Sequence, residues 1–160
     1  MKSLLKYAAV LLWLATPALA HDGVHIVDPY ARVLVGNGAV YLMMINHSDS
    51  DDVLLSASSP DAEMVHLMNS SADANGVMAM AMVDAGLPVR SGDQRILTGG
   101  ADHVMLMGVT RKVTNGDLVT VTLVFEHAGS VTLTVPVDNK RTTPPGMGPT
   151  EFDAVASAAP

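Results

Sequence analysis

Three segments between residues 62 and 108 place methionine or histidine at every second position, with aliphatic residues between them. The segments are Met64-Val65-His66-Leu67-Met68, Val77-Met78-Ala79-Met80-Ala81-Met82 and His103-Val104-Met105-Leu106-Met107. Because residues two apart lie on one face of a β-strand, this alternation predicts three strands. Each strand would direct a set of thioether or imidazole side chains to one side.

Short apolar runs separated by turn signals continue the pattern along the rest of the chain. Asn115-Gly116 is typical of a hairpin and leads into 118–125, where Val119, Val121 and Leu123 alternate with threonines. Further strands are expected at 24–35 (interrupted at Asp28-Pro29), 39–46, 53–58, 94–97 and 131–137. No segment predicts a helix longer than a turn or two. The 160 residues therefore predict one all-β domain, a sandwich or barrel.

The first twenty residues resemble a secretory signal peptide. Lys2 and Lys6 precede an apolar run, and Ala18-Leu19-Ala20 fits a small-residue cleavage site. The run is too short for a membrane span, so we expect export without stable membrane insertion. No cysteine follows the cleavage site, which argues against a lipid anchor there. We expect a folded domain over 21–137 and a flexible tail over 138–160, which begins with a segment rich in proline and glycine.

The charge and the cysteine content narrow the function further. Nine basic and sixteen acidic residues give a formal charge of −7, and removing Lys2 and Lys6 would leave −9. This balance argues against nucleic acid and is compatible with binding a cation or a basic partner. The chain has no cysteine, so it forms no disulfide and offers no thiolate to a metal.

Thioether sulfur is a soft ligand and imidazole is a borderline one. Together, without thiolate, they suit Cu(I) better than Zn²⁺, Mg²⁺ or Ca²⁺. The absence of cysteine excludes a blue-copper electron carrier, which needs a His₂Cys site. The alternative is that the methionines only fill the core. No HExxH, nucleophile elbow or paired-carboxylate signature is present, so we expect no enzyme. A secondary Cu(II) site at His21 or in the tail is an additional hypothesis.

Four features resemble the periplasmic copper chaperones of the PCu(A)C family. They are Asp28-Pro29-Tyr30-Ala31-Arg32, Ala62-Glu63-Met64-Val65, Gly76-Val77-Met78-Ala79-Met80, and Gly99-Gly100 followed by His103-Val104-Met105-Leu106-Met107-Gly108. The resemblance covers residues 24–137. It implies a cupredoxin-like Greek-key β-sandwich that binds Cu(I) through histidine and methionine side chains.

The family motif maps onto Met68, Met80, His103 and Met105. Each of the two long spacings exceeds the family motif by one residue, with eleven residues between Met68 and Met80 and twenty-two between Met80 and His103. The family usually has histidine where this chain has Met68. His66 lies two residues earlier on the same predicted face, so it is a candidate substitute.

The resemblance implies a periplasmic Cu(I) carrier that delivers copper toward the binuclear copper centre of cytochrome c oxidase. Its implied partners are that oxidase subunit or a thioredoxin-like protein of the Sco type. Two alternatives stay open. A copper-buffering or resistance protein would use the same site, and an exported interaction module would use the methionine face as a contact patch.

Overall fold

The computed structural model describes residues 23–72 and 76–147, which form ten β-strands and no helix. The strands are β1 (Val24–Leu34), β2 (Asn37–Asn46), β3 (Asp52–Ser58), β4 (Ala62–Ala72), β5 (Met78–Met82), β6 (Leu87–Val89), β7 (Gln94–Leu97), β8 (His103–Val109), β9 (Leu118–Phe125) and β10 (Ser130–Pro136). The predicted signal peptide, His21 and residues 148–160 lie outside the described residues. In the part of the chain that is described, no helix is long and apolar enough to span a membrane.

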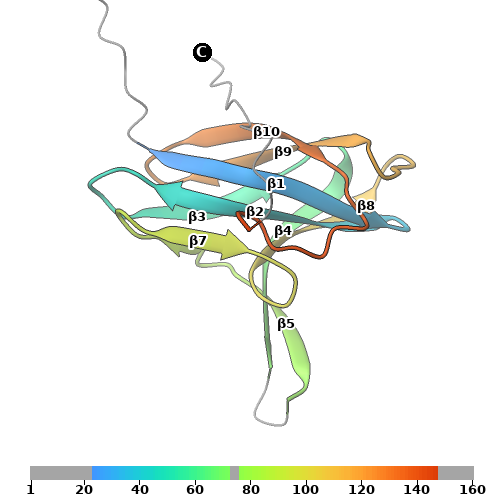
Figure 1. Cartoon of the computed structure of the whole chain (residues 1–160), viewed down its shortest axis with the longest axis horizontal. Coiled ribbons are helices and arrows are strands. Elements are labelled where there is room, and N and C mark those ends of the chain that lie inside the picture. Colours follow the sequence, from blue (N-terminus) through green and yellow to red (C-terminus); the bar gives the residue numbers. More distant parts are fainter. Residues whose placement is uncertain (1–22, 73–75, 148–160) are drawn as a thin grey trace, which may run out of the picture.

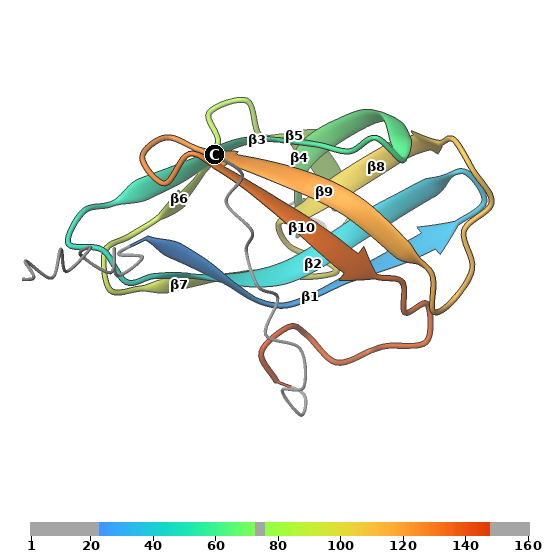
Figure 2. The same cartoon turned by 90° about the horizontal axis from the view of Figure 1, so that it is seen from above.

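The strands form two antiparallel sheets packed face to face. One sheet has the order β1-β2-β8-β4-β5, with β7 also paired to β2, and the other has the order β10-β9-β3-β6. Figure 1 shows the β4–β5 hairpin extending beyond the two layers. In Figure 2, β9 and β10 lie across β1 and β2. The prediction of a single all-β sandwich domain is therefore confirmed.

Alternation along each strand decides which side chains enter the core between the sheets. In β9, Val119, Val121 and Leu123 are fully buried, while the intervening threonines lie on the other face. In the larger sheet, Leu42 and Leu106 are fully buried in the same core. Truncating a side chain of this kind to alanine costs about 2–5 kcal/mol of stability. The aliphatic residues that alternate with Met and His thus hold the sandwich together.

A β-bulge interrupts β1 at the predicted position. Val27 pairs with Met43 and Tyr30 with Tyr41, so β1 has one residue more than β2 over this interval. Asp28 lies in the bulge and has a φ of 52°, a left-handed conformation that Asp tolerates better than most residues. The strand continues through the bulge, so 24–34 is one strand rather than two.

Residues 138–147 are packed against this bulge, although the sequence placed them in a flexible tail. The Arg141 guanidinium donates hydrogen bonds to both Asp28 carboxylate oxygens and lies 4.3 Å from the centroid of the Tyr30 ring. The Gly146 N–H donates to Asp28 as well, over 2.9 Å. Contacts between residues so far apart in the chain leave no signal in local composition. This explains why the sequence predicted a flexible tail where the structure has a packed segment.

Asp28→Asn is expected to lower the free energy of unfolding by roughly 1–2 kcal/mol at pH 7. The hydrogen bonds from Arg141 hold the pKa of Asp28 below its ordinary value, against the opposing effect of burial. A carboxyl with a lowered pKa stabilises the fold above its unfolded pKa of about 3.9, and this contribution is lost as the pH falls through the folded pKa. The difference in the free energy of unfolding between the wild type and the variant should therefore shrink below pH 4.

Urea denaturation at pH 7 and pH 3 measures this effect. Asp49→Asn, at an exposed loop carboxylate, is the matched control and should change stability little at either pH. A difference between wild type and Asp28→Asn that is as large at pH 3 as at pH 7 would contradict the role given to the carboxylate charge.

Candidate metal centre

The first and third methionine-bearing segments form neighbouring strands in register. Across β4 and β8, Met68 pairs with His103 and His66 pairs with Met105. Directly paired residues of antiparallel strands project to the same face, with Cβ atoms about 4.5–5.5 Å apart. The four side chains therefore occupy two adjacent rows on one face of the sheet.

The second segment joins this face from the other side of β4. Across β4 and β5, Met68 pairs with Met82 and Ser70 pairs with Met80. Strand β5 lies at the edge of the sheet, and all five of its residues are exposed. The cross-strand register thus brings all three segments together.

The methionine and histidine face is turned away from the sandwich core. Between these residues, Leu67, Val104 and Leu106 point inward and are at most 5% exposed. By contrast, Met80 is 64% exposed and Met82 is 57% exposed. The alternative that these methionines fill the core is therefore wrong. They lie on the outer surface of the larger sheet, either exposed or half-buried.

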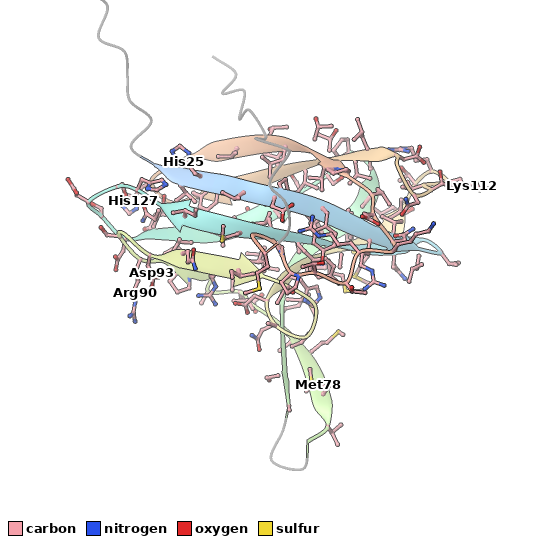
Figure 3. All side chains as sticks on the ribbon, in the orientation of Figure 1. His25, Met78, Arg90, Asp93, Lys112 and His127 are labelled. Carbon is pink, nitrogen blue, oxygen red and sulfur yellow. The ribbon has the colours of Figure 1, made fainter. Side chains whose placement is uncertain are left out.

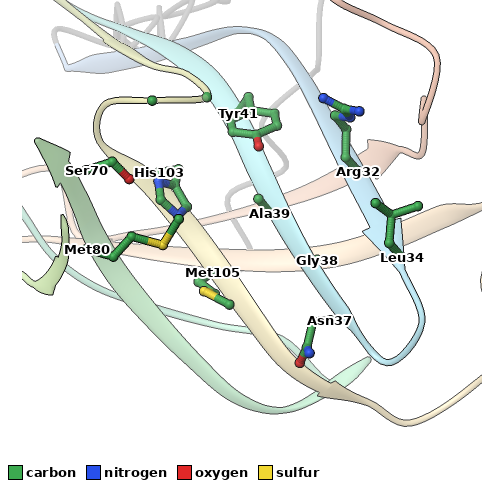
Figure 4. A pocket seen from close by; sticks show the side chains of 12 residues that line it. Arg32, Leu34, Asn37, Gly38, Ala39, Tyr41, Ser70, Met80, His103 and Met105 are labelled. Atoms are coloured by element: carbon green, nitrogen blue, oxygen red, sulfur yellow. The ribbon is translucent and has the colours of Figure 1, made fainter. Parts of the chain in front are cut away.

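Three of the predicted ligands line one hollow of about 360 Å³ on this surface. Met80, His103 and Met105 contribute to its wall, together with Tyr41 and Ser70. Figure 4 shows the Met80 side chain directed toward the His103 ring, with Met105 beside them on β8. One imidazole and two thioethers from two different strands thus converge on the same space.

The His103 ring is fixed in orientation. It is 6% exposed, and its Nδ1 lies 3.0 Å from the carbonyl oxygen of Ala101. In a neutral imidazole, an Nδ1–H that donates to this carbonyl leaves the lone pair on Nε2. The same carbonyl accepts a hydrogen bond of 3.2 Å from the backbone N–H of Ser70 on β4. His103 therefore offers one nitrogen to a metal, with its position set by β4.

Asp102 connects the elements that hold His103. Its Oδ1 accepts a hydrogen bond of 2.7 Å from the Asn69 side chain on β4. Its Oδ2 accepts two hydrogen bonds from the Arg95 guanidinium on β7. Asp102 is 8% exposed, so these partners replace water around its carboxylate. The residue preceding His103 thus ties β4, β7 and β8 together.

Met68 and His66 differ in their relation to the hollow. Met68 is half-buried and pairs directly with His103, although it does not line the hollow. His66 lines a separate hollow of about 200 Å³, together with Met82 and Asp84. The structure thus brings Met80, His103 and Met105 together and has Met68 adjoining them. His66 lies in the other hollow, beside Met82.

Sequence reasoning missed three polar groups around the hollow. The Tyr41 and His103 ring centroids are 6.3 Å apart. The Ser70 Oγ is buried without a hydrogen-bond partner among the described residues, and so is the Arg32 Nε. Tyr41 and Arg32 lie on strands that carry no alternating methionines, and only cross-strand register reveals their position. The extended apolar run from Ala39 was the only signal for Tyr41.

The donor set decides which ions the face suits. The described residues contain no group of three or more His, Cys, Asp or Glu side chains that could hold a metal ion. The ligand sets that Zn²⁺ and Ca²⁺ prefer are thus missing from this part of the chain. Two thioethers and one imidazole suit a soft monovalent ion instead.

The comparison with family models decides which family this chain belongs to. The model of the family described as "Putative lipoprotein LpqE-like" matches residues 24–137. The chain belongs to the LpqE-like family. A relative of this LpqE-like protein, a "Putative lipoprotein" from Leifsonia xyli subsp. xyli, is 27% identical over 124 residues. The match covers 76% of this chain and 74% of the relative.

Solved structures share the fold of the LpqE-like chain. The copper-bound PCuAC domain from PmoF2 has a TM-score of 0.61 and 24% identity, and the match covers 72% of this chain and 92% of that one. The Cu(I) form of DR1885 from Deinococcus radiodurans has a TM-score of 0.54 and 27% identity, over 74% of this chain and 76% of that one. The predicted cupredoxin-like sandwich and the resemblance to the PCu(A)C family are confirmed.

Proposed function

We propose that this LpqE-like protein is an exported metallochaperone that binds Cu(I) through Met80, His103 and Met105, with Met68 as a fourth ligand. The observation that carries the proposal is the hollow in which one oriented imidazole meets two thioethers. Neutral soft ligands stabilise Cu(I) without thiolate. Two of the structural neighbours are copper-bound, and the one with 27% identity holds Cu(I), which supports the same cargo here.

The exposure of Met80, which is 64%, favours a carrier. Met80 lies on the edge strand β5, on the hairpin that projects from the sandwich, and Figure 3 shows Met78 of the same strand. A ligand of a partner can approach such a site from solvent, bind the copper, and displace one thioether at a time. Copper then passes between proteins without a free-ion step, and no proton needs to leave a thioether.

The proposed acceptor is the binuclear copper centre of cytochrome c oxidase, reached directly or through a Sco-type protein. The family resemblance supports this recipient, and the periplasm is the proposed compartment. A copper-buffering protein would hold the same ion at the same residues without passing it on. Mixing the Cu(I)-loaded protein with a copper-free Sco-type domain separates the two, since a carrier transfers its copper within the mixing time and a buffer keeps it.

An anaerobic competition titration of Cu(I) against a chromophoric chelator tests the binding itself. We expect a 1:1 complex that survives competition. A protein-contact module would leave the chelator fully loaded, and that result would overturn the proposed function. Zn²⁺ in place of Cu(I) is the matched control and should compete weakly because the described residues offer no thiolate or carboxylate cluster.

Met68→Leu is expected to weaken Cu(I) binding about tenfold, while His66→Gln should leave it unchanged. Met68 pairs directly with His103, whereas His66, although it pairs with Met105, lines the other hollow. Leucine keeps the volume of methionine and removes only the sulfur. The same titration measures both variants. The opposite result would assign the imidazole of His66 to copper in place of the Met68 thioether.

A further inference from the structure

A guanidinium group forms the wall of the hollow opposite Met105. Arg32 on β1 pairs with Ala39 on β2, and Ala39 pairs with Met105 on β8. The three residues form one row on the outer face, and Figure 4 shows Ala39 between the other two. Because alanine carries only a methyl group, the space above it stays open. Arg32 and Met105 therefore face the same hollow from opposite sides.

Arg32 has no counter-ion among the described residues. Its Nε is buried without a hydrogen-bond partner, and the hollow is lined by no Asp or Glu. Three of the other four arginines each bind a carboxylate, in the pairs Arg95–Asp102, Arg111–Asp61 and Arg141–Asp28, and the fourth, Arg90, is exposed. An unsatisfied buried donor is unfavourable, and more so when it belongs to a charged group.

We infer that Arg32 and the space above Ala39 form a binding site for one carboxylate group. The planar fork of a guanidinium matches the two oxygens of a carboxylate and can donate two parallel hydrogen bonds. A single cation in an acidic protein suits a singly charged anion better than a doubly charged phosphate.

The carboxylate site lies next to the candidate copper ligands, and this position indicates what a bound carboxylate would do. A carboxylate held by Arg32 lies across Ala39 from Met105, at the rim of the hollow that holds the candidate ligands. An Asp or Glu side chain of an incoming protein would be held beside the methionine and histidine face. A free small carboxylate has the same chemistry. The site needs no copper, so its test is independent of the proposed function.

Acetate titration of the copper-free protein, followed by ¹H–¹⁵N NMR of arginine Nε–H and backbone amide signals, tests the inference. Perchlorate keeps the ionic strength constant. We expect a saturable shift of the Arg32 Nε–H signal and of amides around Ala39. Binding should be lost in Arg32→Gln. It should also be lost in Ala39→Leu, which fills the hollow and leaves the guanidinium in place. Arg90→Gln, at an exposed arginine, is the matched control and should bind acetate as the wild type does.

A second titration identifies the source of the carboxylate. A blocked Ala-Asp-Ala peptide that binds at least tenfold more tightly than acetate, with no binding of the Asn counterpart, indicates a protein side chain. Equal binding of acetate and the Asp peptide indicates a free carboxylate. Shifts that rise linearly without saturation would overturn the site. Saturable binding that persists in Arg32→Gln or in Ala39→Leu would also overturn it.

Discussion

His103→Ala is expected to lower the Cu(I) affinity at least about 100-fold, which corresponds to roughly 3 kcal/mol. The variant removes the only imidazole that lines the hollow in the described part of the chain. The ring is 6% exposed and held by the Ala101 carbonyl, so the wild type has little to reorganise when copper binds. None of the three remaining thioethers, those of Met68, Met80 and Met105, supplies a nitrogen donor in its place. Competition with a chromophoric chelator measures the loss, and thermal unfolding checks that the variant still folds.

Methionine variants on β8 and β5 give this prediction its controls. Met105→Leu and Met80→Leu each remove a sulfur at nearly constant volume and should cost about tenfold in affinity. Met107→Leu changes the same strand and face but lies one pair further from His103, opposite Met64, and should bind copper as the wild type does. A loss in Met107→Leu with none in Met105→Leu would move the copper site one row along the sheet, toward Met64.

The strands of this protein could be predicted because their signals are local. Alternation over five to eight residues reports which side chains share a face. The predicted strands at 103–107 and 118–125 form β8, which continues to Val109, and β9. The same alternation identified His103 and Met105 as neighbours on one face. Asn115-Gly116 does mark a turn between β8 and β9, but the hairpin that it predicted is wrong, because the two strands lie in different sheets. In these strands the local backbone preference and the long-range packing agree, so a single sequence window is enough to predict each strand.

The features that the sequence did not predict depend on contacts between residues that lie far apart in the chain. The sequence placed His66 and Met68 on one face, but only the pairing of β4 with β5 and β8 separates their surroundings. Arg32 became part of the hollow through two successive strand pairings. The segment 138–147 looked unstructured because its partner, Asp28, lies more than a hundred residues earlier. Cross-strand register and ion pairs of this kind are set by the whole fold.

Asp102→Ala is expected to lower the free energy of unfolding by about 3 kcal/mol and the Cu(I) affinity about tenfold. The stability falls because Arg95 and Asn69 lose the carboxylate that they share in a largely buried position. The affinity falls because Asp102 precedes His103 and anchors the turn whose Ala101 carbonyl orients the ring. Urea denaturation measures the first effect, and the chelator competition measures the second.

Asp61→Ala separates a positioning role of Asp102 from simple destabilisation. Asp61 also pairs with an arginine, Arg111, and accepts a backbone hydrogen bond from Thr120, but it precedes the opposite end of β4 from Asn69. Its loss should destabilise the fold and leave the Cu(I) affinity unchanged. If Asp102→Ala behaves in the same way, its carboxylate only stabilises the sandwich. A loss of affinity in Asp102→Ala alone means that the network from Arg95 and Asn69 holds His103 in the orientation that copper requires.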